Sequence, residues 1–317
     1  MQYTTLGRTG LRVSVAGLGC GGFSRLGLST GKTEAEAIAL VRLALDLGVN
    51  LIDTAAVYGT EAVVGKALRD VPRESVVVCT KVSRSGGTFD VSNVLASLEA
   101  SLRRLGLDYV DVFQIHAVHP SQYDHVCEEI VPALRREQQR GKFRFLGITE
   151  TSPNDPEHKM LHRAAQDDIW DTAMLAFHLM HQPARQRVFP LTRASGIGTL
   201  MMFAVRQIFA RPAQLASTIK ELAADGLVPA WLKETDDPLS FLVHEGGASS
   251  ITDAAYRFVR HEPGVDVVLF GTGDPSHLRA NVGSILKPAL PATDLAQLAA
   301  LFGHLRGVGL ELPTRRA

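Results

Sequence analysis

The chain has 317 residues, 45% of them hydrophobic, which excludes an intrinsically disordered polypeptide and supports a compact fold. Its 33 Lys and Arg residues balance 33 Asp and Glu residues, so no net charge exists to attract nucleic acid or an anionic membrane. The three cysteines Cys20, Cys79 and Cys127 lie far apart, which disfavours a disulfide framework or a closed zinc site and is typical of a reducing compartment.

The amino-terminal segment gives no sign of export. Residues 1–10 lack a basic stretch followed by an apolar one, and no run approaches the ~18 uninterrupted apolar residues of a membrane span. We therefore expect a cytoplasmic protein that binds neither membranes nor nucleic acid. The sequence gives no indication of oligomeric state.

Short β-rich apolar runs alternate with helix-length amphipathic segments along the whole chain. Strands are predicted at residues 13–20, 50–55, 76–82, 109–116, 145–149, 172–177, 197–203 and 265–271. Helices are predicted at residues 34–47, 60–69, 91–104, 121–139, 157–166, 182–194, 213–224, 252–260 and 275–285, and a last one in the tail after Pro291. Thr33 and Glu36 have the spacing of a capping box, and Gly48 and Gly141 mark helix ends.

This alternation predicts the fold class. Strand–helix–strand units pair their strands in parallel, and eight units close an α/β barrel of the (β/α)8 or TIM type. We expect a single barrel domain over residues 1–317. Residues 2–14 contain two β-prone stretches around Gly7–Gly10, which predict a hairpin that plugs the amino-terminal mouth. Residues 206–250 exceed the length of a barrel loop and are expected to form part of a site.

Four ionisable side chains fall at the carboxyl ends of three neighbouring predicted strands. Asp53 ends the second strand and Tyr58 follows it, while Lys81 and His116 end the third and fourth. Because the active site of such a barrel lies at this end, we expect the four to converge. An ion pair between Asp53 and Lys81 would account for two of them without any function, but packing alone favours apolar residues at all four positions.

These residue types suit the reduction of a carbonyl group. Hydride addition builds negative charge on oxygen, which requires a proton donor, and Tyr58 could supply it if the Lys81 cation lowered the pKa of the phenol. Asp53 would hold Lys81 charged and oriented, and His116 would hydrogen-bond the carbonyl oxygen. An aldolase that uses Lys81 as a Schiff base is a weaker hypothesis, because it leaves Tyr58 and His116 without a purpose.

The sequence resembles the aldo-keto reductase family over nearly its whole length. The motifs that carry the resemblance are, in the family's order, GLGCGGF, NLIDTAAVYGTEAVVGKAL, VVVCTKV, SLRRLGLDYVDVFQIH, GKFRFLGIT and VVLFGTGDPSHLRANV. Asp53, Tyr58, Lys81 and His116 fall on the family's catalytic tetrad. The resemblance implies an NAD(P)H-dependent oxidoreductase acting on a small carbonyl or alcohol substrate. Because channel β-subunits belong to the same family, a cofactor-binding regulatory protein with little turnover is the alternative.

The resemblance also implies which residues meet the cofactor near the nicotinamide. After the first strand they are Gly19, Cys20 and Gly21, together with Asp53. The residues expected beside the substrate are Phe23, Tyr58 and His116. Other positions depart from the family pattern: Thr149 and Glu150 replace a Ser-Asn pair, Met174 replaces Gln, and Phe203, Ala204 and Val205, followed by Arg206, replace Ser-Pro-Leu. The nicotinamide pocket is therefore expected to be atypical.

The last β/α unit, GTGDPSHLRAN, resembles the family's adenosine-phosphate loop. Gly271, Thr272 and Gly273 are expected at the phosphates, with the helix that begins near Pro275 offering free amides, and Asn281 at the adenine. The basic residue that often binds the 2′-phosphate is replaced by Gly273 or His277, and Arg279 is the expected substitute. Because the family tends to use NADP and both His277 and Arg279 lie near the phosphate position, we predict NADP as cofactor, with NAD as the alternative.

Several histidines attract attention without indicating a metal site. His158 and His162 have the i, i+4 spacing of metal ligands but lack the accompanying Glu of a HExxH motif, so we expect an exposed helix face and no metal. His178 and His181 are predicted to be structural rather than pocket-lining.

Overall fold

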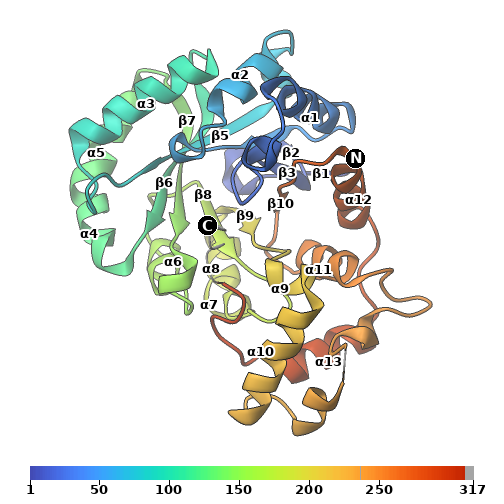
Figure 1. Ribbon diagram of the computed structural model, residues 1–317. Helices are drawn as coiled ribbons and strands as arrows, with labels where there is room; N and C mark the ends of the chain where they lie inside the picture. The colour runs from blue at the N-terminus through green and yellow to red at the C-terminus, as the bar shows by residue number, and fades with distance from the viewer. Residues whose placement is uncertain (236, 311–317) are drawn as a thin grey trace.

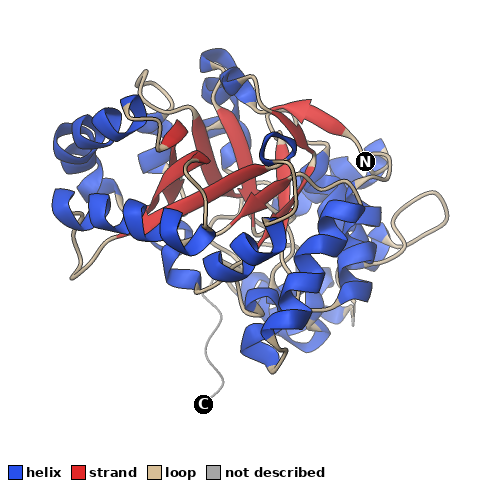
Figure 2. Ribbon diagram, turned by 90° about the horizontal axis from the view of Figure 1, so that it is seen from above, coloured by secondary structure: helices blue, strands red, loops and turns tan. Residues whose placement is uncertain are grey.

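Eight parallel strands close into a barrel in the computed structural model, which describes residues 1–235 and 237–310. Figure 1 and Figure 2 show the strands at the centre and the helices around them. In barrel order the strands are β3 (Ala16–Gly19), β4 (Leu51–Asp53), β5 (Val77–Ser83), β6 (Val110–Val118), β7 (Phe143–Glu150), β8 (Thr172–Ala176), β9 (Gly198–Met202) and β10 (Val267–Phe270). Pairing of β10 with β3 closes the ring. The eight predicted strands and the barrel fold class are confirmed.

Helices follow the strands as expected. They are α1 (Glu34–Asp46), α2 (Glu61–Leu68), α3 (Val91–Leu105), α4 (Tyr123–His125), α5 (Val131–Gln139), α6 (Lys159–Ala164), α7 (Ala184–Arg187), α8 (Phe189–Ser195), α9 (Gln207–Ala210), α10 (Pro212–Ala224), α11 (Ile251–Arg260), α12 (Pro275–Ile285) and α13 (Ala292–Phe302). A π-helical turn over Val126–Ile130 joins α4 to α5. The helix predicted at 182–194 is divided into α7 and α8, because Pro190 has no N–H to continue the helical hydrogen bonds.

The predicted capping box and the predicted helix-ending glycines are present at the ends of α1 and α5. The Thr33 hydroxyl accepts the Glu36 amide at 3.2 Å, and the Glu36 carboxylate accepts the Thr33 amide at 2.8 Å, which completes the capping box of α1. Gly48 and Gly141 follow α1 and α5 with φ of +85° and +80°, a conformation that side chains disfavour. The chain therefore leaves these helices where predicted.

The amino-terminal hairpin closes one mouth of the barrel. Strand β1 (Tyr3–Thr5) pairs antiparallel with β2 (Arg12–Ser14). Leu6 and Val13 are fully buried in one apolar cluster with Leu51 and Val77, the first residues of β4 and β5. A Cβ on Gly7 would lie 2.2 Å from the amide nitrogen of Gly198, at the start of β9. The predicted plug is confirmed, and the barrel opens only at the carboxyl ends of its strands.

The long segment after β9 is mostly helical. It contains α9, the predicted helix α10 and two short 3-10 turns, and it lies beside α13 on the side of the barrel away from α3 and α5 (Figure 1). In the part of the chain that the structure describes, no helix combines the length and apolar character needed to cross a membrane.

Candidate active site

A large cleft opens at the carboxyl ends of the barrel strands. Its volume is about 1780 Å³. One end is bordered by Tyr58 and His116, and the other by residues of α11 and α12. Small-molecule pockets usually measure about 300–1,000 Å³, so this cleft has room for a dinucleotide and a small substrate together.

Asp53 and Lys81 form a buried ion pair beneath the first end. The Lys81 Nζ lies 2.8 and 2.6 Å from the two Asp53 carboxylate oxygens and 2.9 Å from the carbonyl oxygen of Thr54. The Gln114 amide donates to Asp53 at 3.2 Å. Lys81 is fully buried and Asp53 nearly so. Every ammonium proton has an acceptor, so the cation is held in one place.

The ionisation of this pair follows from its contacts. Burial alone would lower the pKa of Lys81, but the charge and the hydrogen bonds of the Asp53 carboxylate outweigh it and raise that pKa. Burial also raises the pKa of Asp53, against which the Lys81 cation acts. With both carboxylate oxygens bonded to Nζ, the pair is a charged one.

Tyr58 and His116 meet above the ion pair. The Tyr58 hydroxyl lies 3.3 Å from His116 Nε2, and the two rings stand edge to face. The Lys81 Nζ is 5.1 Å from the centre of the Tyr58 ring, and the backbone of Gly21 lies flat against that ring, leaving no room for a Cβ. The predicted catalytic residues therefore converge, as strand order required.

His116 is neutral in this setting. Burial, reinforced by the Lys81 cation, lowers its pKa to about 3. Its Nδ1 lies 2.9 Å from the Ser83 hydroxyl. When that hydroxyl donates to Nδ1, Nε2 carries the single ring proton and faces the cleft as a donor.

Lys81 acts on the pKa of Tyr58 in the predicted direction, but the net shift has the opposite sign. Burial raises the pKa of Tyr58 above its ordinary value, and the Lys81 cation offsets this only in part. The physical reason is that the phenol is buried, which disfavours the phenolate by more than the Lys81 cation stabilises it, and the Asp53 carboxylate adds to the rise. The prediction of a lowered pKa is wrong, and the phenol stays protonated at neutral pH.

A backbone irregularity sets the position of His116. The pairing of β6 with β7 shifts register between Ile115 and Val118, and Ala117 has φ of +56°. The Ala117 amide donates to the Thr149 hydroxyl at 2.7 Å. Thr149 therefore fixes the strained backbone next to His116 in addition to lining the cleft.

The Glu150 carboxylate is buried beneath the cleft surface and forms several hydrogen bonds there. Its carboxylate accepts the Ala176 amide at 2.8 Å and the Ser152 hydroxyl at 2.9 Å, and it lies 2.6 Å from His158 Nδ1. His158 is fully buried and precedes α6 with φ of +55°, so the prediction that it lies on an exposed helix face is wrong; His162 is exposed. The reason is that a buried carboxylate requires a partner. No group of His, Cys, Asp and Glu among the described residues is arranged to hold a metal ion.

A model of the Aldo/keto reductase family matches residues 17–302. The chain belongs to this family. It is 41% identical to the L-galactose dehydrogenase of Arabidopsis thaliana over 208 residues, which cover 63% of this chain and 64% of that protein. It is 27% identical to the aldo-keto reductase YhdN of Bacillus subtilis over 311 residues, which cover 88% and 87% of the two chains.

Solved structures agree with this assignment. A putative aldo-keto reductase from Pseudomonas aeruginosa superposes with a TM-score of 0.64 at 28% identity, covering 89% of this chain and 93% of that one. The chain thus spans less than two thirds of the L-galactose dehydrogenase but nearly all of this structural neighbour.

Most residues predicted to meet the cofactor or substrate of this aldo-keto reductase line the cleft. Those that do are Gly19, Gly21, Phe23, Asp53, Tyr58, His116, Thr149, Glu150, Met174, Phe203, Val205, Arg206, Gly271, Thr272, Gly273, His277 and Asn281. Cys20 and Arg279 do not line it. The Cys20 side chain is fully buried, and Arg279 is exposed elsewhere on α12.

The cleft of this aldo-keto reductase fits the nicotinamide cofactors that its family uses. At the far end Gly271 and Gly273 present backbone without side chains, and Asn281 lies beside them. Gly273 also packs on Gly27, where an added Cβ would lie 2.4 Å from the Gly27 Cα. The loop after β3 thus touches both Tyr58, through Gly21, and the far end of the cleft, through Gly27.

Two supporting residues of this aldo-keto reductase were not predicted. Ser83 hydrogen-bonds His116 and lies two positions after Lys81 on β5. Gln114 hydrogen-bonds Asp53 and lies two positions before His116 on β6. The register pairs Lys81 with Gln114 and Ser83 with His116. Because alternate strand residues share a face, polar residues at this spacing could have indicated both.

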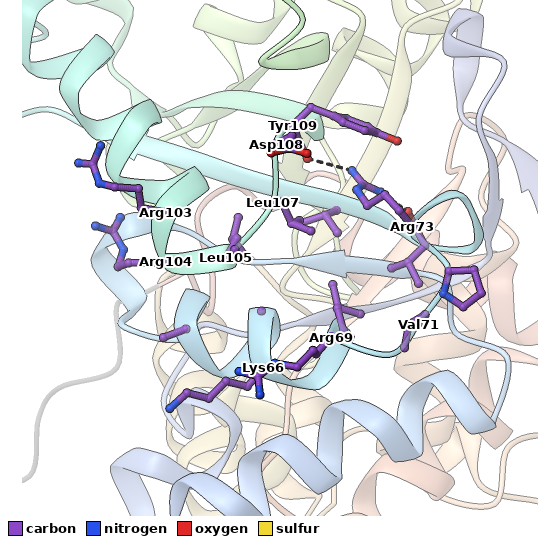
Figure 3. Close-up of a pocket in the computed structure, with 17 residues that line it drawn as sticks. Lys66, Arg69, Val71, Arg73, Arg103, Arg104, Leu105, Leu107, Asp108 and Tyr109 are labelled. Carbon is purple, nitrogen blue, oxygen red and sulfur yellow. Dashed lines mark hydrogen bonds between the residues drawn. The ribbon is translucent and has the colours of Figure 1, made fainter.

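A second hollow lies apart from the cleft and shares no lining residue with it. It measures about 500 Å³ between α2, α3 and the starts of β5 and β6. Figure 3 shows Arg103 and Arg104 extending away from Leu107, and Arg73 turned toward Tyr109. Three of its cations are compensated within the chain, by the ion pairs Lys66–Glu34, Arg104–Glu61 and Arg73–Asp111. Most of the positive charge that lines the hollow is therefore compensated within the chain.

Proposed function

We propose that the chain is an NAD(P)H-dependent oxidoreductase that interconverts an aldehyde or ketone with an alcohol, using Tyr58 as the proton donor. The observation that carries the proposal is the 3.3 Å contact between the Tyr58 hydroxyl and His116 Nε2 at the cleft wall, above the Asp53–Lys81 pair. This arrangement directs two neutral donors at one point beside a fixed cation. We further propose a single cytoplasmic barrel domain, in keeping with three free cysteines.

The chain's own residues handle the proton and the developing charge. A bound reduced nicotinamide supplies the hydride. Tyr58 gives its proton to the carbonyl oxygen, so hydride and proton together yield the alcohol, and the fixed Lys81 cation stabilises the phenolate that remains. Neutral His116 donates a hydrogen bond that orients the oxygen. In the reverse direction Tyr58 accepts the proton.

An aldose is a candidate substrate for the oxidation direction. The 41% identity to an L-galactose dehydrogenase favours it. Polar side chains also line the cleft on the His116 side, including Arg84, Thr151 and Asn154, and these can hydrogen-bond several hydroxyl groups. The sequence-based preference for NADP depends on the tendency of the family and on His277 and Arg279, of which His277 lines the cleft and Arg279 does not.

The alternative hypotheses predict different outcomes. A regulatory protein would bind cofactor without turnover, and a Schiff-base aldolase would need a free Lys81 amine, whereas Nζ is bonded to Asp53 and Thr54. The test follows absorbance of the reduced nicotinamide with a panel of aldehydes and ketones in one direction and aldoses, L-galactose included, in the other. Turnover with any of them is expected. Cofactor binding with no turnover across the panel would favour the regulatory alternative, and borohydride trapping of a substrate on Lys81 would favour the aldolase.

A further inference from the structure

We propose that the adenosine end of the cleft selects NAD(H) over NADP(H), and that Asp274 makes this selection. The inference rests on the proposed function only in assuming that a nicotinamide dinucleotide occupies the cleft. It reverses the preference for NADP that the sequence alone suggested. The two cofactors differ by one 2′-phosphate, which carries about two negative charges near neutral pH.

Asp274 places a carboxylate where a 2′-phosphate would need cations. It lines the far end of the cleft as the residue that caps α12. Its Oδ1 accepts the Ser276 amide at 2.7 Å, the His277 amide at 3.1 Å and the Ser276 hydroxyl at 2.5 Å. The amides that the start of this helix could offer to a phosphate are therefore already bonded to an anion of the chain.

The Asp274 carboxyl is negatively charged at neutral pH. Its hydrogen bonds from Ser276 and His277 lower the pKa of the carboxyl to about 2, so it is ionised at any pH where the protein would work. A 2′-phosphate at this end would meet like charge, which disfavours its binding.

The two lysines that line the cleft near this end are paired inside the chain. Lys287 lies 3.0 Å from the buried Asp253 carboxylate and donates to the Ser249 hydroxyl at 3.1 Å. Lys32, which packs on Gly27 beside Gly273, lies 3.0 Å from Glu36. Two further cations line the cleft among the described residues, Arg84 and Arg206, and they follow β5 and β9 rather than β10. A phosphate would have to compete with a carboxylate for either lysine.

The same carboxylate suits an unmodified ribose. Asp274 Oδ2 accepts no hydrogen bond from any residue in the described part of the chain, while Oδ1 takes three. A carboxylate oxygen is an acceptor only, and a ribose hydroxyl is a donor that the 2′-phosphate lacks. One side chain thus favours NAD(H) and opposes NADP(H).

Direct binding tests this without turnover. Fluorescence titrations of NADH and NADPH, without substrate, would compare wild type with Asp274→Asn, which removes the charge and keeps a good helix cap. We expect wild type to bind NADH at least about tenfold more tightly, the scale of one charge-assisted contact, and the ratio of the two dissociation constants to fall by about tenfold in the variant, mainly through tighter NADPH. Asp274→Ser, also a good cap, repeats the test, and thermal melts verify folding.

Asp108→Asn is the matched control, because it removes the same charge from an exposed position beside the second hollow. It should leave the ratio unchanged within about twofold, as expected for a distant screened charge. Equal or tighter binding of NADPH by wild type overturns the inference, and so does an unchanged ratio in both Asp274 variants. If neither cofactor binds, the proposed function fails and the inference with it. If NADH is preferred but no carbonyl or alcohol turns over, only the proposed catalysis fails.

Discussion

The barrel mouth contains two buried carboxylates, Asp53 at one side and Glu150 at the other, and their charges are compensated in different ways. At the ends of β4 and β5, buried Asp53 is paired with Lys81, and that pair touches the residues that border the cleft. At the end of β7, buried Glu150 is paired with His158 and the Ala176 amide, and its partner turns away from the cleft into the core. A buried carboxylate at a strand end is therefore not in itself a sign of catalysis. What distinguishes the two is what the partner contacts: Lys81 lies against the ring of Tyr58, which lines the cleft, whereas His158 packs against buried His181.

Among changes at the Asp53–Lys81 side of the mouth, removal of the Lys81 cation should have the largest effect on turnover. Lys81→Met should reduce turnover by roughly 10³-fold or more, since both the fixed charge and the orientation of the site are lost. Loss of the cation should also raise the pKa of Tyr58 further, because burial then acts unopposed. Oxidation needs the phenolate, so its rate should rise at higher pH than in wild type. Steady-state rates against pH measure both, and a profile unchanged from wild type would remove Lys81 from the mechanism.

Removing the hydroxyl of Tyr58, the proposed proton donor, should reduce turnover less than removing the Lys81 cation. Tyr58→Phe keeps the ring against Gly21 and leaves cofactor binding nearly unchanged, while turnover should fall by roughly 10²-fold or more. Single-turnover kinetics with prebound reduced cofactor isolate the chemical step. Near-normal turnover with the best substrate would mean that another group supplies the proton.

The two buried carboxylates should differ in their contribution to stability. Asp53→Asn leaves Lys81 buried without its counter-charge and should lower the free energy of unfolding by about 3 kcal/mol. Glu150→Gln keeps an acceptor for Ala176 and a donor for His158, so its cost should be about 1 kcal/mol. Urea denaturation of both variants provides the comparison. A larger loss in Glu150→Gln would show that the contacts of Glu150 contribute more to stability than the Asp53–Lys81 ion pair.

The smallest effect concerns His116. Because burial and Lys81 lower its pKa to about 3, the residue stays neutral, and kcat for reduction should vary by less than about twofold between about pH 5 and pH 8. The same profile with His116→Gln, which keeps a donor but cannot titrate, is the control. A wild-type transition near the ordinary histidine pKa that is absent from the variant would mean that His116 carries the proton.

The sequence predicts one half of this mouth better than the other for a physical reason. The barrel and the convergence of Asp53, Lys81 and His116 depend on strand period and on which end of a strand a residue occupies, and both are local properties. The pairing of Glu150 with His158 depends on a left-handed turn that carries the histidine inward before α6 begins, which residue spacing does not reveal. Likewise, the sequence predicts that Arg279 lies on α12, but it does not reveal that the residue lies on the face away from the cleft. The direction of the Tyr58 pKa shift depends on a balance between burial and charge that only the assembled site determines.

The loop after β3 contacts both ends of the cleft and fixes the distance between them. One stretch of backbone presses Gly21 on the Tyr58 ring and Gly27 on Gly273, so Tyr58 and residues 271–273 are held at a separation set by the five residues between Gly21 and Gly27. Both contacts are backbone-close and leave no space for a side chain. The loop therefore acts as a spacer between the two ends of the cleft. Lengthening it by a single residue would disturb the two ends together, even though no residue of either end had been changed.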